Sequence, residues 1–301
     1  MLSDYVNTLG QSLLSAYGER VHKVAIDAGL SCPNRDGSKG IGGCTFCNNA
    51  TFSPNGRVPE PILKQIQNGR EVLLKRTGAK KYIAYFQAYT NTYGDVKALK
   101  TMYEQALAEK DVVGLSVGTR PDCVPDEIID LLVDYQNQGF DIWLELGLQS
   151  AFNETLKRVN RGHGFEEYKK TLLAARAKGL RVCTHLIIGL PGEDESHFKS
   201  TLQQVLDLGV DGLKFHPLHV VKGTQLANEW RRGEYQPMEM DYYVEMVAKL
   251  IEMAPDDMIY HRLTGTANDK QLLAPAWCNK KWKVLNAIET ELKNRKEVLW
   301  N

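Results

Sequence analysis

The chain has 301 residues, of which 43% are hydrophobic and 25% charged, a composition that supports a packed core and excludes a disordered protein. Its 37 basic residues balance 37 acidic ones, so any RNA contact must come from local basic patches rather than from net charge. No apolar run reaches the roughly 18 residues that span a membrane, no secretory signal opens the sequence, and its 6 cysteines fit a reducing compartment, so we expect a cytoplasmic protein without membrane contact.

The first predicted element is an amphipathic helix over Met1–Gly18. We expect it to pack on the rest of the fold as an N-terminal unit of residues 1–20. A short apolar run, Lys23–Ala28, follows it and predicts the first strand.

The loop after this strand contains Cys32, Cys44 and Cys47. Cys44 and Cys47 have the C-x-x-C spacing that lets two thiolates reach one metal centre, and glycines in the loop allow tight turns. Three thiolates without a nearby fourth suit a [4Fe–4S] cluster with one iron open to a substrate or cofactor. Zinc held with a histidine such as His22 is the alternative, because structural zinc takes four ligands. The low cysteine content argues against a disulfide.

Apolar runs rich in β-branched and aromatic residues then alternate with amphipathic segments at intervals of about 30–40 residues, the spacing of βαβ units. The predicted strands are Lys23–Ala28, Tyr82–Phe86, Val112–Val117, Asp141–Leu148, Arg181–Ile188 and Gly212–Phe215. The predicted helices are Ile62–Arg76, Asp95–Glu109, Asp126–Gln138, Glu166–Lys178 and Glu195–Asp207. Gly139, Gly179 and Gly209 follow three of these helices, as C-terminal caps do. The pattern predicts parallel strands covered by helices.

Polar or unusual residues follow the C-terminal end of every predicted strand. Barrels assemble their active sites at that end from several strands, whereas an open doubly wound sheet concentrates them at one switch point. We therefore predict an α/β fold, a partial (β/α)6 TIM-type barrel over residues 21–255 with a small C-terminal extension over residues 256–301. The extension contains a candidate extra strand, Met258–Arg262, and a charged helix, Lys283–Lys296.

Basic residues of the extension interleave with tryptophans that could stack on RNA bases. They are Lys280, Lys281, Lys283, Lys293, Arg295 and Lys296, with Trp277 and Trp282. A solvated helix face is the competing interpretation.

Several stretches together resemble the radical S-adenosylmethionine (SAM) superfamily, most closely its YhcC/YtqA-type family and more distantly the radical domain of the Elp3 proteins. They are Ser31–Gly37, Ala84–Thr90, Val117–Pro125, Trp143–Ser150, Asn160–His163, His185–Glu193 and His216–Thr224. The eleven residues between Cys32 and Cys44 match the long cysteine loop of the Elp3-type branch. This resemblance implies a barrel of the radical SAM type, a [4Fe–4S] cluster on the three cysteines, SAM on the open iron, and a flavodoxin- or ferredoxin-like electron donor.

The same resemblance implies a SAM-contacting turn at Ala88, Tyr89 and Thr90. Related enzymes have glycines at this turn, which holds the amino group of SAM. Because this chain lacks them, backbone carbonyls or Gln87 would make the contact.

Four more SAM contacts are implied by matching positions. Gln149 and Arg161 match two SAM-contacting residues of the coproporphyrinogen-oxidising relatives, so they would bind ribose hydroxyls and the SAM carboxylate respectively. His185 matches an aspartate that binds the ribose, and Gly189 begins a turn that backs the adenine. Gly118 stands where many relatives place a glutamate, so one polar contact is missing.

Candidate catalytic residues are Glu145, His216, His219 and Lys222. Glu145 alternates with apolar residues on a predicted inner strand, so pairing with a buried arginine competes with contact to substrate. His216 and His219 follow the sixth strand, and Lys222 belongs to a segment shared with the Elp3 proteins.

Two functions fit these features. The first is tRNA modification at the wobble uridine side chain, with conversion of carboxymethylaminomethyl-uridine to aminomethyl-uridine as the step that the family context implies. The second is radical chemistry on a small metabolite, such as a tetrapyrrole or an amino acid, which suits the neutral net charge. A monomer is the default expectation.

Overall fold

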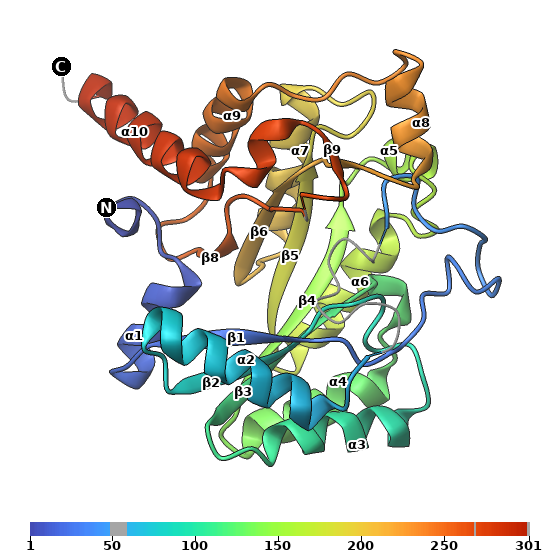
Figure 1. Ribbon diagram of the computed structural model, residues 1–301, viewed down its shortest axis with the longest axis vertical. Helices are drawn as coiled ribbons and strands as arrows, with labels where there is room; N and C mark the ends of the chain where they lie inside the picture. The colour runs from blue at the N-terminus through green and yellow to red at the C-terminus, as the bar shows by residue number, and fades with distance from the viewer. Residues whose placement is uncertain (49–58, 268, 300–301) are drawn as a thin grey trace.

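The computed structural model describes residues 1–48, 59–267 and 269–299, and within them the fold is built on one parallel sheet of seven strands in the order β1-β2-β3-β4-β5-β6-β8 (Figure 1). The strands of this sheet are β1 (Val21–Ile26), β2 (Lys81–Phe86), β3 (Val112–Thr119), β4 (Asp141–Gln149), β5 (Arg181–Ile188), β6 (Gly212–Pro217) and β8 (Ile259–Arg262). A small antiparallel sheet joins β7 (Val220–Val221) to β9 (Leu272–Ala274). The large sheet curls into a half-barrel, as predicted.

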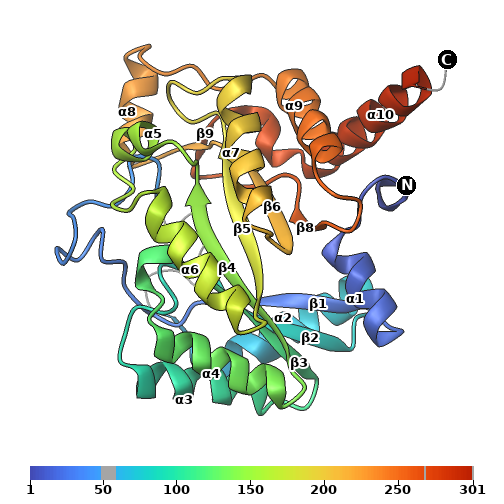
Figure 2. The ribbon, with the colours of Figure 1, turned by 180° about the vertical axis from the view of Figure 1, so that it is seen from behind.

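Helices precede, connect and follow the strands, and several of them cover the outer face of the sheet (Figures 1 and 2). The helices are α1 (Leu9–Tyr17), α2 (Ile62–Thr77), α3 (Val96–Leu107), α4 (Asp126–Asn137), α5 (Asn153–Arg158), α6 (Phe165–Ala177), α7 (Glu195–Asp207), α8 (Gln225–Arg231), α9 (Met240–Met253) and α10 (Lys281–Leu299). Short 3-10 helices occupy Leu2–Asp4, Pro121–Cys123 and Ala276–Asn279. No helix in the described ranges is both long enough and apolar enough to cross a membrane.

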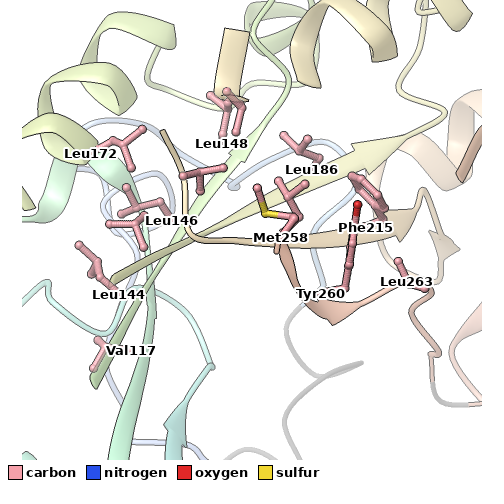
Figure 3. Packing of buried hydrophobic residues seen from close by; sticks show 14 of the residues in the cluster. Val117, Leu144, Leu146, Leu148, Leu172, Leu186, Phe215, Met258, Tyr260 and Leu263 are labelled. Atoms are coloured by element: carbon pink, nitrogen blue, oxygen red, sulfur yellow. The ribbon is translucent and has the colours of Figure 1, made fainter. Parts of the chain in front are cut away.

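The outer face of the sheet and the helices form the main hydrophobic core. Leu144, Leu146 and Leu148 of β4 are fully buried in it, because alternate residues of a strand point to the same face (Figure 3). Leu172 of α6 and Phe215 of β6 belong to the same cluster. This core holds the strands in the register that places their C-terminal ends together.

The N-terminal end of the half-barrel is closed by α1. Its Leu9 and Leu13 pack against Ile83, Trp143 and Cys183, which are buried on the inner face of the sheet. The segment before α1 also pairs with β8, since the Tyr260 N–H donates to the Asn7 carbonyl at 2.9 Å. The helix predicted over Met1–Gly18 is thus shorter than expected: it begins at Leu9, after a separate 3-10 helix at Leu2–Asp4, and it closes this end of the half-barrel.

The structure differs from the sequence-based expectation at the last strand. The sequence predicts six strands in the barrel and assigns Met258–Arg262 to the extension, but β8 pairs in parallel with β6. The helix α9 is not among the predicted elements either. The β5 and α7 bounds agree with the prediction, and Gly139, Gly179 and Gly209 have φ of 94°, 75° and 76°, as helix-capping glycines do.

Candidate active site

A cavity of about 240 Å³ lies at the C-terminal ends of the strands. The loop after β1 contributes Cys32, Cys44 and Cys47, and the strands β2 to β6 contribute inward-facing or terminal residues. Strand ends from across the half-barrel thus meet at one place, which is where β/α barrels carry their active sites.

The cysteine loop is held by hydrogen bonds of its own and by the loop after β4. The Gly43 N–H donates to the Asn34 carbonyl at 2.8 Å, and the side chain of Asn34 donates to the Asn160 carbonyl. The Cys47 N–H donates to the Cys44 carbonyl at 3.0 Å, which forms the C-x-x-C turn. Gly43 has φ of 84° and a built Cβ would lie 3.0 Å from the Arg35 side chain, so glycine is needed there.

The three cysteines are all thiols, with Cys44 buried and the other two partly exposed. Among the described residues, the set of three ligand atoms that lie within 4.8 Å of one another is that of Glu145, Cys183 and His261. At least one pair of the three cysteine sulfurs is therefore more than 4.8 Å apart, wider than the roughly 3.8 Å separation expected around one tetrahedral zinc. This spread favours a cluster of several metal ions over a single ion.

The proposed zinc alternative also lacks its named fourth ligand. His22 lies on β1 but does not line the cavity. Burial, followed by the charges of Arg20 and Lys281, lowers the pKa of His22.

The thiol of Cys47 is protonated in the absence of a metal. Burial, reinforced by the neighbouring Cys44, raises its pKa to about 12, so this thiol keeps its proton until a metal replaces it.

Arg161 brings a positive charge to the cysteines. Its Nη1 lies 3.6 Å from the Cys44 sulfur, and its Nη2 donates to the Gly147 carbonyl. A built Cβ at Gly147 would lie 2.7 Å from Nη2, so any side chain there would displace the guanidinium. The buried Nε has no hydrogen-bond partner in the described part of the chain. A buried donor of this kind is expected to meet a ligand.

Backbone strain is concentrated around the cavity. Among described residues other than glycine, positive φ occurs at Tyr89 (61°), Gln149 (81°) and Asn160 (51°). Tyr89 and Gln149 line the cavity, and Asn160 immediately precedes Arg161. Such conformations cost about 1–3 kcal/mol each and cluster at functional sites.

The structure brings together most of the residues expected to contact SAM. Gln87, Tyr89, Thr90, Gln149, Arg161 and His185 line the same cavity as the cysteines. Ala88 is buried and does not line it, and Gly189 lines a separate surface pocket with Tyr235 and Glu239. The roles expected of these residues stay predictions.

Glu145 lies beneath the cavity, fully buried, and pairs with lysines rather than with arginine. Its Oε1 accepts from Lys23 Nζ and Ser116 Oγ, and its Oε2 accepts from Lys214 Nζ at 2.9 Å. His185 Nε2 donates to Oε2 as well. These partners come from β1, β3, β5 and β6, so Glu145 ties the inner faces of distant strands together.

The electrostatics of this network follow from burial and pairing. Burial alone would raise the pKa of Glu145, but Lys214 and Lys23 outweigh it and hold the pKa well below its usual range. Burial lowers the pKa of Lys214 to about 8 although Glu145 opposes the shift, and it lowers the pKa of His185 to about 4. Near neutral pH the Glu145 carboxylate and Lys214 are charged and His185 is neutral.

The two histidines after β6 also line the cavity. The rings of His216 and His219 pack edge to face with their centroids 4.6 Å apart, and His216 Nδ1 donates to the Pro217 carbonyl at 2.8 Å. Burial lowers the pKa of His216 well below its usual range and that of His219 to about 4. Lys222 is exposed, lies outside the cavity and uses its backbone N–H to bind the Gln271 carbonyl.

Sequence analysis missed Lys214, which lines the cavity. The available signal was its inward position on a strand whose neighbours, Leu213 and Phe215, are apolar and face the outer core. Tyr85 is missed as well, although it lines the cavity and binds Lys214.

Comparisons with known proteins identify the family. A sequence model of the radical SAM superfamily matches residues 32–205, and a model of the radical SAM C-terminal domain matches residues 210–294. Protein YhcC of Escherichia coli K12 is 47% identical over 281 residues, which are 93% of this chain and 90% of that protein. The uncharacterized protein YtqA of Bacillus subtilis is 40% identical over 290 residues, which are 96% of this chain and 90% of that protein.

More distant relatives include proteins that act on tRNA. The tRNA uridine(34) acetyltransferase of Methanocaldococcus jannaschii is 33% identical over 152 residues, which are 49% of this chain and 27% of that protein. The structure of Methanocaldococcus infernus Elp3 has the same fold, with a TM-score of 0.67 and 21% identity; the match covers 92% of this chain and 63% of that one. The superfamily match and the near full-length similarity to YhcC agree with the three-cysteine cavity: the chain belongs to the radical SAM superfamily.

Proposed function

We propose that this radical SAM enzyme modifies the wobble uridine of tRNA by converting its carboxymethylaminomethyl side chain to an aminomethyl group. The observation that carries the proposal is the single cavity in which three cysteines, Arg161 and the ends of five strands meet. Support for RNA as substrate comes from the similarity to the tRNA uridine(34) acetyltransferases.

The residues of the cavity fit the cofactors of the family, a [4Fe–4S] cluster and SAM. Cys32, Cys44 and Cys47 supply three thiolates, the number that leaves one iron of such a cluster open. When bound, the cluster and SAM supply a 5′-deoxyadenosyl radical that removes a hydrogen atom from the substrate. Radical SAM enzymes need an electron donor, and we propose a flavodoxin- or ferredoxin-like protein for that role.

The chain's own residues would orient SAM and exclude water. The Arg161 guanidinium, whose Nε has no partner among the described residues, suits the SAM carboxylate. Gln149 and His185 offer polar atoms for ribose hydroxyls, and the strained turn at Tyr89 and Thr90 offers backbone carbonyls for the amino group. Gly189 and the turn after it would back the adenine from outside the cavity.

The chemistry of the proposed substrate suits hydrogen removal. The carbon of its carboxymethyl group lies between a nitrogen and a carboxylate, and both substituents weaken its C–H bonds. Removal of one hydrogen atom by the 5′-deoxyadenosyl radical, then of one electron by an electron acceptor and of the nitrogen proton, would leave an imine between that carbon and the nitrogen. Addition of water would break this bond, release the two-carbon fragment as glyoxylate and leave the aminomethyl side chain. His216 and His219, neutral and on the cavity wall, can accept or pass a proton during this change.

The start of α10 is the candidate RNA contact. The Trp282 side chain is 72% exposed, and Lys281 Nζ lies 5.5 Å from its ring centroid. Trp277, in contrast, packs on Tyr243 and donates its indole N–H to the Met238 carbonyl, so it does not offer a free ring. We propose that Trp282 and its neighbouring lysines bind the tRNA, and that the reaction takes place in the cytoplasm.

Mass spectrometry of tRNA nucleosides tests the proposal. Cells that lack the protein should accumulate carboxymethylaminomethyl-uridine and lose nucleosides derived from aminomethyl-uridine, and the wild-type gene should restore the profile. A gene with Cys44→Ala should not restore it. An unchanged profile would contradict the proposal and favour a small-metabolite substrate.

A further inference from the structure

The layer of charged residues beneath the cavity is not electrically balanced. Glu145 is the carboxylate to which both Lys23 and Lys214 are paired, and its side chain is fully buried. The Lys23 side chain is 18% exposed and that of Lys214 is 8% exposed. Arg262 lies close enough to add a further positive charge to Lys214. A buried positive charge without a counterion is costly, so this layer favours the binding of an anion.

Lys214 is the member of the layer that can meet that anion. It lines the cavity, whereas Lys23, Glu145 and Arg262 do not. Its Nζ donates to the Tyr85 hydroxyl at 2.6 Å and to Glu145 Oε2 at 2.9 Å. An ammonium group has three donors, so one N–H is left over among the described contacts.

We propose that Lys214 binds the carboxylate of the substrate side chain at the floor of the cavity and so selects the carboxymethylaminomethyl group. The inference rests on the function proposed above, because it takes the substrate from it. Tyr85 and Glu145 act as positioning residues, since each fixes one of the other two N–H groups of Lys214.

The carboxylate of SAM is the other candidate anion, and the geometry assigns it elsewhere. Arg161 lies beside Cys44 at the cysteine loop, while Lys214 lies on β6 and contacts the fully buried Glu145. The two cations line one cavity but have different neighbours, so each is assigned a carboxylate of its own.

Binding of synthetic anticodon stem-loop RNA tests the assignment. One RNA carries carboxymethylaminomethyl-uridine at the wobble position, and its partner carries the neutral primary amide in place of the carboxylate. The wild-type holoenzyme should bind the acid at least about tenfold more tightly than the amide, the size of one charged hydrogen bond. In Lys214→Gln this preference should disappear, while Lys214→Arg should keep it.

Lys81→Gln is the matched control, because Lys81 pairs with Glu19, outside the layer around Glu145, and does not line the cavity. It should keep the preference for the acid. Preference for the acid that survives Lys214→Gln, or loss of SAM binding in that variant, would overturn the assignment while leaving tRNA as substrate. Failure of the wild-type enzyme to bind either RNA would instead overturn the tRNA proposal, and the assignment with it.

Discussion

The two ends of the half-barrel are built from the same strands and have different roles. At the N-terminal end, inward residues such as Ile83 and Trp143 pack against Leu9 and Leu13 of α1. At the C-terminal end, the same strands present polar groups to a cavity and the chain carries its strained backbone. One strand can therefore stabilise the fold through the inward-facing residues at its start and line the active site with those at its C-terminal end. The predictions below test this separation.

The largest difference is expected from cysteine substitutions at the two ends. Cys44→Ala should abolish normal cluster binding, because two thiolates do not hold the cluster as three do. Cys183→Ala, at the N-terminal end, should leave binding of about four iron and four sulfide unchanged. Iron and sulfide analysis after anaerobic reconstitution measures both. Cluster loss in Cys183→Ala, or uptake of a single zinc in place of iron, would contradict the prediction.

The stability of the fold should depend on the buried residues of α1, which closes the N-terminal end of the half-barrel. Leu13 is 4% exposed and Leu14 is 38% exposed on the same helix. Leu13→Ala should lower the free energy of unfolding by about 2–5 kcal/mol through cavity formation, whereas Leu14→Ala should stay within about 0.5 kcal/mol of wild type. Urea titration of both variants tests this, and equal losses would show that α1 does not close the barrel.

SAM binding should depend on the C-terminal end. Arg161→Ala removes a charge-assisted pair and should weaken SAM binding by about 2–3 kcal/mol. Arg158→Ala is the control, because Arg158 pairs with Glu229 and is 45% exposed. Calorimetric titration of SAM into reconstituted protein measures both variants. Wild-type affinity in Arg161→Ala would remove Arg161 from the SAM site.

The pH dependence of substrate binding should report Lys214. Burial lowers its pKa to about 8, so the lysine is charged below pH 8 and loses its charge above it. Affinity for the carboxylate stem-loop should therefore fall above about pH 8, by at most about tenfold per pH unit, while the amide stem-loop shows no such fall. Lys214→Arg should abolish the dependence, because arginine stays charged. The same fall for both RNAs would point to another group.

The smallest effect is expected at the outer surface. The triple variant Lys280→Glu, Lys281→Glu and Lys283→Glu should bind tRNA more weakly than wild type. The slope of log K against log salt concentration should become shallower by about one for each phosphate that a lysine no longer neutralises. Release of 5′-deoxyadenosine without substrate should not change, because none of these lysines lines the cavity. Binding of tRNA that ignores both salt and these charge reversals would favour a small metabolite.

Local patterns in the sequence account for much of the fold. The bounds of β5 and α7 could be predicted because periodicity, caps and glycines are all local signals. The strand β8 could be identified as a strand, but its place beside β6 depends on contacts far apart in the sequence. The long helix α9 could also have been predicted, because its pattern of buried apolar residues is present in the sequence.

Some residues of the candidate site could likewise be predicted from local sequence signals, whereas others depend on contacts between distant strands. The cysteine loop could be found because Cys44 and Cys47 have a diagnostic spacing. Lys214 could not be found, because a single lysine in an apolar strand gains meaning only when it meets Tyr85 and Glu145 from other strands. Glu145 is a candidate from the sequence, but its burial among lysines depends on how the half-barrel curls.

The pairing of the N-terminal segment with β8 has a consequence for solution behaviour. A half-barrel leaves two strand edges, here β1 and β8, whose backbone groups could pair with another chain. The Tyr260 N–H donates to the Asn7 carbonyl, and Thr8 forms an isolated parallel β-bridge with Tyr260. The first residues of the chain therefore act as protection against edge-to-edge aggregation, at the edge where the barrel stops short of closure.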